Sequence, residues 1–527
     1  MSRNITFTNF GACGAVLLAA ALLRFCGSSA RWTGGHIGYN GATYSIVARN
    51  HLRYGFLATK FLSAKESPCT PGALRYNIHH PPLLGILTAS SFYLFGESEF
   101  SARLLPIIFS IGNLCLLYLL VRPLWGSATA LLSVFFAAFM TMDAFYGPQV
   151  EVFGSLVLFF ILCAYLCYRR WICTSRASYL FASLLSLTLA IFTEWTGYYT
   201  LILIAVEEWL RREFPRTFRP IFRLYLSVGV GAFLLYLAMV RIATGAITGG
   251  TWVEAFLFRL NMGHGAASYP FTLSQYIRTV ASYLIAYFGY SVLVLSAAGL
   301  VAVFISDAGE ENAGRLVVAL NLLILGWVHL VVFRNVVYIH SYTLFNLTPS
   351  LSLLAAIGAV RARNYAARFS PLLGYGMLGA ILLLHAGSSI EQLHREHQGL
   401  DFDRGYRFGN LVQSLSGQRD IVICSFDRRP EYEYYADRII IYGVTSRDDL
   451  EKACAEVKGR RIAWYAADEL SRGRIDERLL GYLSERYPCS HYGTYTLFDM
   501  RDGSSGRKND EAGNDNTLAC PQASAEI

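Results

Sequence analysis

The sequence is poor in charge. Only 16% of its 527 residues are Asp, Glu, Lys or Arg, whereas 54% are hydrophobic, and its mean hydropathy is positive at +0.37. Soluble globular chains carry about a quarter charged residues, so this scarcity excludes an ordinary soluble protein. Apolar windows of about 17–25 residues, long enough to cross a bilayer, recur along the chain instead. The composition predicts a polytopic α-helical membrane protein with about eleven spanning helices (ten to thirteen).

Metal-binding and nucleotide-binding signatures are also scarce. The eleven cysteines form no CxxC pair and no zinc-like cluster, so we predict no obligatory metal cofactor. A divalent ion on Glu151 or Glu194 stays an open alternative. No glycine-rich phosphate loop and no sizeable predicted cytoplasmic domain offer a place for a nucleotide sugar.

The predicted spans are evenly spread over the first three quarters of the chain. They lie at 10–26, 104–121, 126–143, 152–168, 178–193, 196–209, 223–243, 279–304, 315–333, 342–360 and 370–386. The first is interpreted as a retained anchor, because the small-residue stretch after Cys26 resembles a cleavage site only weakly.

Arginines in the short loops predict the orientation. They follow the fourth, sixth and tenth spans: Arg169, Arg170 and Arg176; Arg211, Arg212, Arg216, Arg219 and Arg223; and Arg361, Arg363 and Arg368. Loops rich in arginine stay cytoplasmic, which places 27–103, 244–278 and everything after 387 outside. Topology therefore accounts for the net charge of +8, and we predict no nucleic-acid partner.

The last quarter of the chain has a different pattern. Four short apolar segments, "DIVICSF", "RIIIYGV", "RRIAWYAA" and "HYGTYTLFDM", alternate with helical segments. This alternation predicts a small α/β domain with a largely parallel sheet. The predicted domains are a transmembrane domain at 1–386, a linker at 387–404, an extracytoplasmic α/β domain at 405–501 and a disordered tail at 502–527.

The first outer loop contains two candidate interfacial helices. In "YNGATYSIVARNHLRYGF", Arg49 and Arg53 are four residues apart on one helical face, so their guanidiniums can bind a lipid phosphate by bidentate hydrogen bonds. Snorkelling to phospholipid headgroups is the alternative. Residues 83–95 follow Pro81 and Pro82, which fit a helix start, and predict a surface or re-entrant helix.

Three strings in this loop occur in a characteristic order: "YNGATYSIVARNHLRYGF", "HHPPL" and "LFGESEFSARLLP". Together with "FTEWTGYY" and "RNVVYIHSYTLFNLTP", they resemble the protein O-mannosyltransferase and aminoarabinose-transferase superfamily over roughly residues 10–360. The resemblance implies a membrane glycosyltransferase of the GT-C fold. It also implies inverting transfer of a hexose or pentose from a polyprenyl-phosphate donor, on the outer face of a membrane.

The resemblance also suggests site residues. His80 corresponds to a polar or cationic residue near the donor phosphate, with helix capping as the alternative. The usual acidic base is missing, because Asn40 occupies its place and no carboxylate occurs between residues 27 and 65. Outer residues that can replace it are Glu151 first, Glu194 second and His36 third, each carboxylate having a structural ion pair as its alternative.

Other polar residues near the outer ends of the spans are candidates for substrate binding. Arg334, His340 and Tyr342 lie in one outer turn, whereas Arg259 and His264 are more typical of solvated loop residues. The acceptor can be a lipid, a glycan or a protein, and the expected location is a bacterial inner membrane. Two rival functions remain: a non-catalytic glycolipid-binding relative and a transporter, although no internal repeat supports the latter.

Overall fold

The computed structural model describes residues 2–66, 74–210, 218–245, 256–260, 270–306, 313–400, 403–457, 460–469 and 471–501. The chain forms two compact units. One comprises residues 1–415 and 429–437, and the other comprises residues 416–428 and 438–527. The predicted tail at 502–527 lies outside the described residues.

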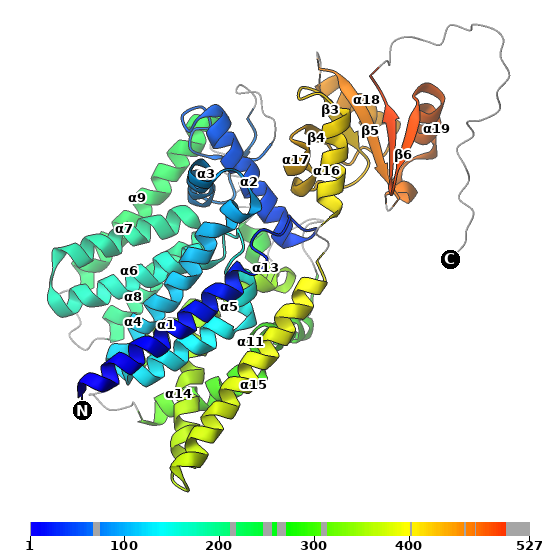
Figure 1. Ribbon diagram of the computed structural model, residues 1–527. Coiled ribbons are helices and arrows are strands. Elements are labelled where there is room, and N and C mark those ends of the chain that lie inside the picture. Colours follow the sequence, from blue (N-terminus) through cyan, green and yellow to red (C-terminus); the bar gives the residue numbers. More distant parts are fainter. Residues whose placement is uncertain are drawn as a thin grey trace, which may run out of the picture. The chain divides into compact units, whose positions relative to one another are not determined.

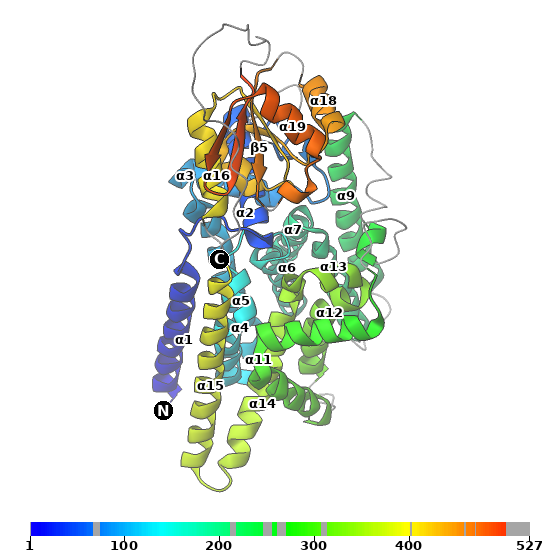
Figure 2. The same ribbon diagram turned by 90° about the vertical axis from the view of Figure 1, so that its right-hand side faces the viewer.

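The larger unit is helical (Figures 1 and 2). The segment between α1 and α4 contains α2 (His36–Tyr54), β1 (Ser63–Ala64), β2 (Tyr76–Asn77) and α3 (Leu83–Phe95). The remaining helices are α1 (Ser2–Phe25), α4 (Glu99–Phe139), α5 (Thr141–Tyr146), α6 (Ser155–Thr174), α7 (Ala177–Thr193), η1 (Trp195–Tyr198), α8 (Tyr199–Leu210), α9 (Phe218–Thr244), α11 (Leu273–Ser306), α12 (Ala313–Val332), α13 (Arg334–Ile339), η3 (Ser341–Leu347), α14 (Thr348–Ala366), α15 (Pro371–Gln398), α16 (Arg404–Leu415) and α17 (Pro430–Ala436).

Each predicted span coincides with a helix. Within the described residues, seven helices are long and apolar enough to cross a membrane, and α1, α3 and α7 are shorter apolar helices. Two predicted spans, 104–121 and 126–143, share α4, which is kinked at Gly126 where φ is +85°. Helices α1, α4 and α15 run nearly parallel in both views (Figures 1 and 2). The predicted polytopic helical fold is confirmed.

The two predicted outer helices are present with nearly the predicted bounds. Helix α2 packs on α3, and a Cβ at Gly85 would lie only 2.6 Å from Val47 Cγ1. Any larger residue at 85 would push these helices apart. Pro82 is the N-cap of α3, where its missing N–H leaves no helical hydrogen bond unmade.

The smaller unit is an α/β domain. Its sheet has the strand order β4 (Ile439–Ile441), β3 (Ile421–Cys424), β5 (Ile462–Asp468), β7 (Tyr495–Asp499) and β6 (Cys489–Tyr492). Helices α18 (Arg447–Glu456) and α19 (Glu477–Arg486) cover one face through Leu450, Leu479 and Leu483, and the short helix η4 (Arg472–Arg474) precedes α19.

The prediction of a largely parallel sheet is wrong. Strand β3 pairs in parallel with β4 and β5, but β7 pairs antiparallel with β5 and β6. The string "HYGTYTLFDM" contains a hairpin rather than one strand, because Gly493 adopts a left-handed φ of +58° between β6 and β7.

Candidate functional site

Glu151 is the centre of a buried polar cluster. It lies in the irregular segment between α5 and α6, and its side chain is only 3% exposed. Its Oε2 accepts a hydrogen bond from Asn40 Nδ2 at 2.6 Å and lies 3.2 Å from His36 Nε2. Its Oε1 accepts from the backbone N–H of Val152 at 3.0 Å. Both carboxylate oxygens are therefore bound by the protein.

The surroundings keep Glu151 ionised. Burial raises the pKa of a carboxyl group, but the charge and hydrogen bond of His36, the Asn40 amide and the Val152 N–H outweigh burial. The net effect is a pKa below the ordinary glutamate value. The cluster thus holds a carboxylate at neutral pH, paired with an imidazole.

The first turns of α2 bring His36 and Asn40 to Glu151. Residues 36 and 40 are four apart and lie on one helical face. Trp32 packs against this turn, and a Cβ at Gly41 would lie only 2.1 Å from the indole ring. Glycine at 41 therefore lets the segment before α2 fold back on it and fixes the helix start.

Two residues from the segment between α13 and α14 complete this cluster. Tyr342 stacks on the His36 ring with 4.3 Å between centroids and 9° between planes, and His340 lies 4.5 Å from it. Burial and then the charge of His36 lower the pKa of His340 to about 4, despite the opposing effect of Glu151. His340 is therefore neutral at physiological pH, and His36 is the imidazole that pairs with Glu151.

A second glutamate–histidine pair joins Glu194 to His80. Glu194 is the C-cap of α7, its side chain is 1% exposed, and its Oε2 lies 2.6 Å from His80 Nδ1. Tyr236 fixes the backbone of this loop by donating a hydrogen bond to the carbonyl of His80 at 3.2 Å. Among the described residues, Glu194 Oε1 has no hydrogen-bond partner although it is buried.

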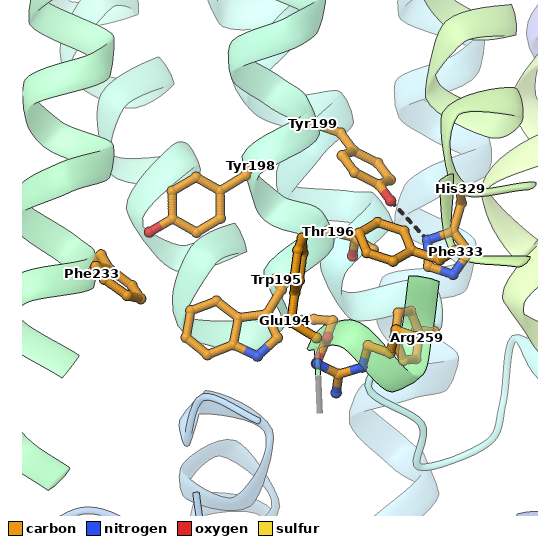
Figure 3. Close-up of a pocket in the computed structure, with 11 residues that line it drawn as sticks. Glu194, Trp195, Thr196, Tyr198, Tyr199, Phe233, Arg259, His329 and Phe333 are labelled. Atoms are coloured by element: carbon orange, nitrogen blue, oxygen red, sulfur yellow. Dashed lines mark hydrogen bonds between the residues drawn. The ribbon is translucent and has the colours of Figure 1, made fainter. Parts of the chain in front are cut away.

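Glu194 also lines a pocket of about 460 Å³ (Figure 3). Most of its walls are aromatic, and its polar members include Arg259 and His329. His329 Nδ1 shares a hydrogen bond with the Tyr199 hydroxyl at 2.8 Å, drawn as a dashed line in Figure 3. The lining residues are Phe153, Glu194, Trp195, Thr196, Tyr198, Tyr199, Phe233, Phe256, Arg259, His329 and Phe333.

Three buried polar atoms on the wall of this pocket lack a partner among the described residues. They are Glu194 Oε1, Thr196 Oγ1 and His329 Nε2. An unsatisfied buried polar group costs about 1–3 kcal/mol, so pairing of these three groups with water or with a ligand hydroxyl would be favourable. In the lining, Arg259 is the group that can donate to an anionic head, and the aromatic side chains suit an apolar ligand.

The two glutamate–histidine pairs are close neighbours. Phe153 lies 6.2 Å from the His80 ring and 5.9 Å from the Tyr342 ring, so one side chain connects both clusters. Burial, followed by the charges of Glu194 and Glu151, raises the pKa of Tyr44. The candidate site is thus a single region with two acid–imidazole pairs.

Arg49 and Arg53 are engaged elsewhere. Arg53 makes two hydrogen bonds to the carboxylate of Asp437, at 3.0 and 2.7 Å. Arg49 pairs with Glu97 and, at 3.2 Å, with Asp437. These contacts favour a structural role, and the predicted grip on a lipid phosphate stays a prediction.

A double measurement separates the two roles. We expect Arg49→Gln to lower the free energy of unfolding by about 1–3 kcal/mol, because it leaves Glu97 without this charged partner, whereas Asp437 keeps Arg53. Donor affinity should stay within about twofold of the wild-type value, because Arg49 contacts carboxylates of the protein. A twofold change in affinity corresponds to well under about 1.4 kcal/mol of binding free energy. Thermal unfolding and donor binding of the same preparation test this. Weaker donor binding at unchanged stability would support the phosphate role.

The structure separates the remaining predicted residues. His36, Asn40, His340 and Tyr342 gather around Glu151, whereas Arg334 begins α13 and is exposed. Arg259 is not the solvated loop residue that its glycine-rich neighbourhood suggests, because it lines the pocket. His264 lies outside the described residues. Within those residues, no group of three potential metal ligands comes together.

Sequence reasoning did not identify the aromatic lining. Trp195, Tyr198 and Tyr199 occur in the string "FTEWTGYY", in which the sequence points to Glu194 but not to its aromatic neighbours. The signal that could have identified this lining is a run of aromatic residues beside a glutamate at the end of an apolar helix. A span that packs only against lipid does not require such a run.

Comparison with known proteins supports the family assignment. A family model described as dolichyl-phosphate-mannose-protein mannosyltransferase matches residues 79–242. The structure of ArnT from Cupriavidus metallidurans bound to undecaprenyl phosphate is similar over 94% of this chain and 99% of that chain, with a TM-score of 0.63 and 12% identity. The chain has the GT-C fold. The resemblance predicted from the ordered sequence strings is thereby confirmed.

Other GT-C structures are similar as well. The oligosaccharyltransferase AglB from Archaeoglobus fulgidus, in complex with an inhibitory peptide and a dolichol-phosphate, has a TM-score of 0.57 and 12% identity, covering 94% of this chain and 75% of that one. The arabinofuranosyltransferase AftD from Mycobacteria has a TM-score of 0.51 and 12% identity, covering 92% of this chain and 39% of that one. Among curated proteins, none matches this sequence.

Proposed function

We propose that the protein is an inverting glycosyltransferase that uses a polyprenyl-phosphate-linked hexose or pentose as donor. The observation that carries this proposal is the aromatic pocket beside Glu194 and Arg259, with its three unsatisfied polar atoms. Its apolar wall suits part of an isoprenoid chain, and Arg259 suits the phosphate. The structures that are similar include one bound to undecaprenyl phosphate and one bound to a dolichol-phosphate.

In this proposal the two acid–imidazole pairs have different chemical roles. His80, which pairs with the pocket residue Glu194, is assigned to the phosphate side, where a ring N–H can donate a hydrogen bond to the leaving group. The Glu151–His36 pair takes the proton of the acceptor on the other side of Phe153. Attack from the side opposite the phosphate inverts the anomeric carbon. The acceptor is a lipid, a glycan or a protein outside the membrane.

Release of polyprenyl phosphate tests this function without knowledge of the acceptor. The full chain in lipid nanodiscs should bind a polyprenyl-phosphate sugar and hydrolyse it slowly, with water in place of the acceptor. A panel of hexoses and pentoses on the same carrier identifies the sugar. Donor binding without release for every sugar would indicate the non-catalytic relative, and lipid movement across liposomes without release would indicate a transporter.

The proposed topology has its own test. We place the loop around Arg169 and Arg176 in the cytoplasm and residues 390–527 outside a bacterial inner membrane. In a background without other cysteines, the exposed Cys173 should react with an impermeant thiol reagent only after permeabilisation. Ser490→Cys, on the exposed part of β6, should react in spheroplasts. Protection of residue 490 in spheroplasts would overturn an outer active site.

A further inference from the structure

Glu151 and His36 differ in how accessible they are to an acceptor, and the proposed function does not say which of the two takes the proton. Glu151 is 3% exposed and both of its oxygens are bound, whereas His36 is 32% exposed. An acceptor hydroxyl that reached Glu151 would have to displace Asn40 or His36 from Oε2. The residue that the acceptor can meet directly is His36.

The hydrogen bonds of His36 leave one ring nitrogen for the acceptor. Its Nε2 faces inward, 2.8 Å from Asn40 Nδ2 and 3.2 Å from Glu151 Oε2. In the described part of the chain, no hydrogen bond is made by Nδ1. Tyr342 covers one face of the ring and neutral His340 lies beside it, so Glu151 is the only ionised group found in direct contact with the imidazole among those residues.

We propose that His36 is the catalytic base and that Glu151 is a positioning residue that orients and stabilises its imidazolium form. This inference rests on the proposed glycosyl transfer and names the group that performs its proton transfer. In the tautomer that carries its proton on Nε2, His36 donates to the Glu151 carboxylate, Asn40 donates to Glu151 alone, and Nδ1 is left as the acceptor. Asn40 donates to the same carboxylate oxygen and holds it in place.

The step conserves atoms and charge. The acceptor O–H bond breaks and its proton moves to Nδ1 of His36, while the oxygen bonds to the anomeric carbon. The bond between that carbon and the donor phosphate breaks, and its electron pair stays on polyprenyl phosphate. Glu151 carries the balancing negative charge next to the new imidazolium, which later loses its proton to water.

This arrangement also accounts for Asn40. A carboxylate at position 40 would place a second negative charge 2.6 Å from Glu151, in a site already closed to water. Like charges at that distance cannot both stay ionised. An amide, which donates a hydrogen bond, is the group that stabilises Glu151 as the partner of a histidine.

Chemical rescue tests the assignment. With the full chain in nanodiscs and the best polyprenyl-phosphate sugar, His36→Ala should lose at least about a hundredfold in turnover while donor affinity stays unchanged. Free imidazole should restore turnover saturably in His36→Ala. It should not change turnover in the control His385→Ala, which removes a buried histidine that contacts Phe135 and Phe136 and leaves the base in place.

The pH profile supplies a second readout. The acid limb of kcat/KM should disappear in His36→Ala and should persist in Glu151→Gln, which keeps the imidazole. If His36→Ala keeps wild-type turnover, or is inactive without rescue while Glu151→Gln has no acid limb, Glu151 is the direct base and the inference is wrong. A wild-type protein that releases no polyprenyl phosphate from any sugar would overturn the proposed function and this inference together.

Discussion

Glu151→Gln should accumulate in the membrane at wild-type levels, bind the lipid-linked donor and turn it over at least about a hundredfold more slowly. The substitution keeps the shape and one hydrogen-bond acceptor of the side chain. It removes the negative charge that His36 Nε2 faces at 3.2 Å. Losses of about 10²–10⁴ in rate are typical when proton transfer is disabled. Release of polyprenyl phosphate, normalised to folded protein, measures the effect.

Glu207→Gln is the matched control for this experiment. Glu207 is equally buried but accepts a hydrogen bond from Tyr165 at 2.6 Å and pairs with Arg169, away from the pocket. Its loss should reduce the yield of folded protein and leave turnover per folded molecule intact. Glu194→Gln should lower yield more, and turnover less, than Glu151→Gln. If Glu151→Gln stays fully active while Glu194→Gln is folded and inactive, the order of the candidates is reversed.

Arg259→Met is expected to weaken donor binding about ten- to a hundredfold. A hydrogen bond to a charged group is worth about 1.5–3 kcal/mol, and each 1.4 kcal/mol is a factor of ten in affinity. Methionine keeps much of the aliphatic stem against the aromatic wall and removes the charge. Titration with a polyprenyl-phosphate sugar and with an uncharged polyprenol separates the contribution of the Arg259 charge from that of the apolar contacts. Only binding of the phosphate-bearing ligand should weaken.

Arg278→Met provides the comparison for Arg259. Arg278 is an exposed arginine near the start of α11, a helix that contributes nothing to the pocket lining in the described residues. Removing its charge should leave both affinities unchanged. Equal weakening in the two variants would indicate a general surface attraction to anionic lipid rather than a phosphate site at Arg259.

The helical fold could be predicted because membrane spans are specified locally. Lipid leaves no alternative to a long apolar helix, so windows of hydropathy located the seven long apolar helices of the described residues, and Pro82 marked the start of α3. The hairpin at Gly493 was missed because one glycine in an apolar string is a weak signal against a continuous strand.

The candidate site was predictable only in part. The family resemblance implied a base that is missing at Asn40, and the cost of ionisable groups near hydrocarbon then pointed to Glu151, Glu194 and His36 as candidates. Which histidine meets which glutamate depends on contacts across more than 100 residues, such as those of His36 with Glu151 and of His80 with Glu194. For the same reason, a helical spacing that fits a phosphate could not reveal that Asp437 occupies Arg49 and Arg53.

That last contact has a consequence for biosynthesis. Asp437 lies 384 residues after Arg53 in the chain, and it ends α17, which is part of the helical unit although β3 and β4 on either side of it are not. Helix α2 leaves the ribosome well before α17, so its arginines meet this partner only after the 384 residues that separate Arg53 from Asp437 have been synthesised. Long waits before distant contacts expose a chain to misassembly. The helix that presents His36 should therefore be among the last parts of the protein to mature, and a prematurely terminated chain should be recognisable to quality-control proteases by the unpaired arginines of α2.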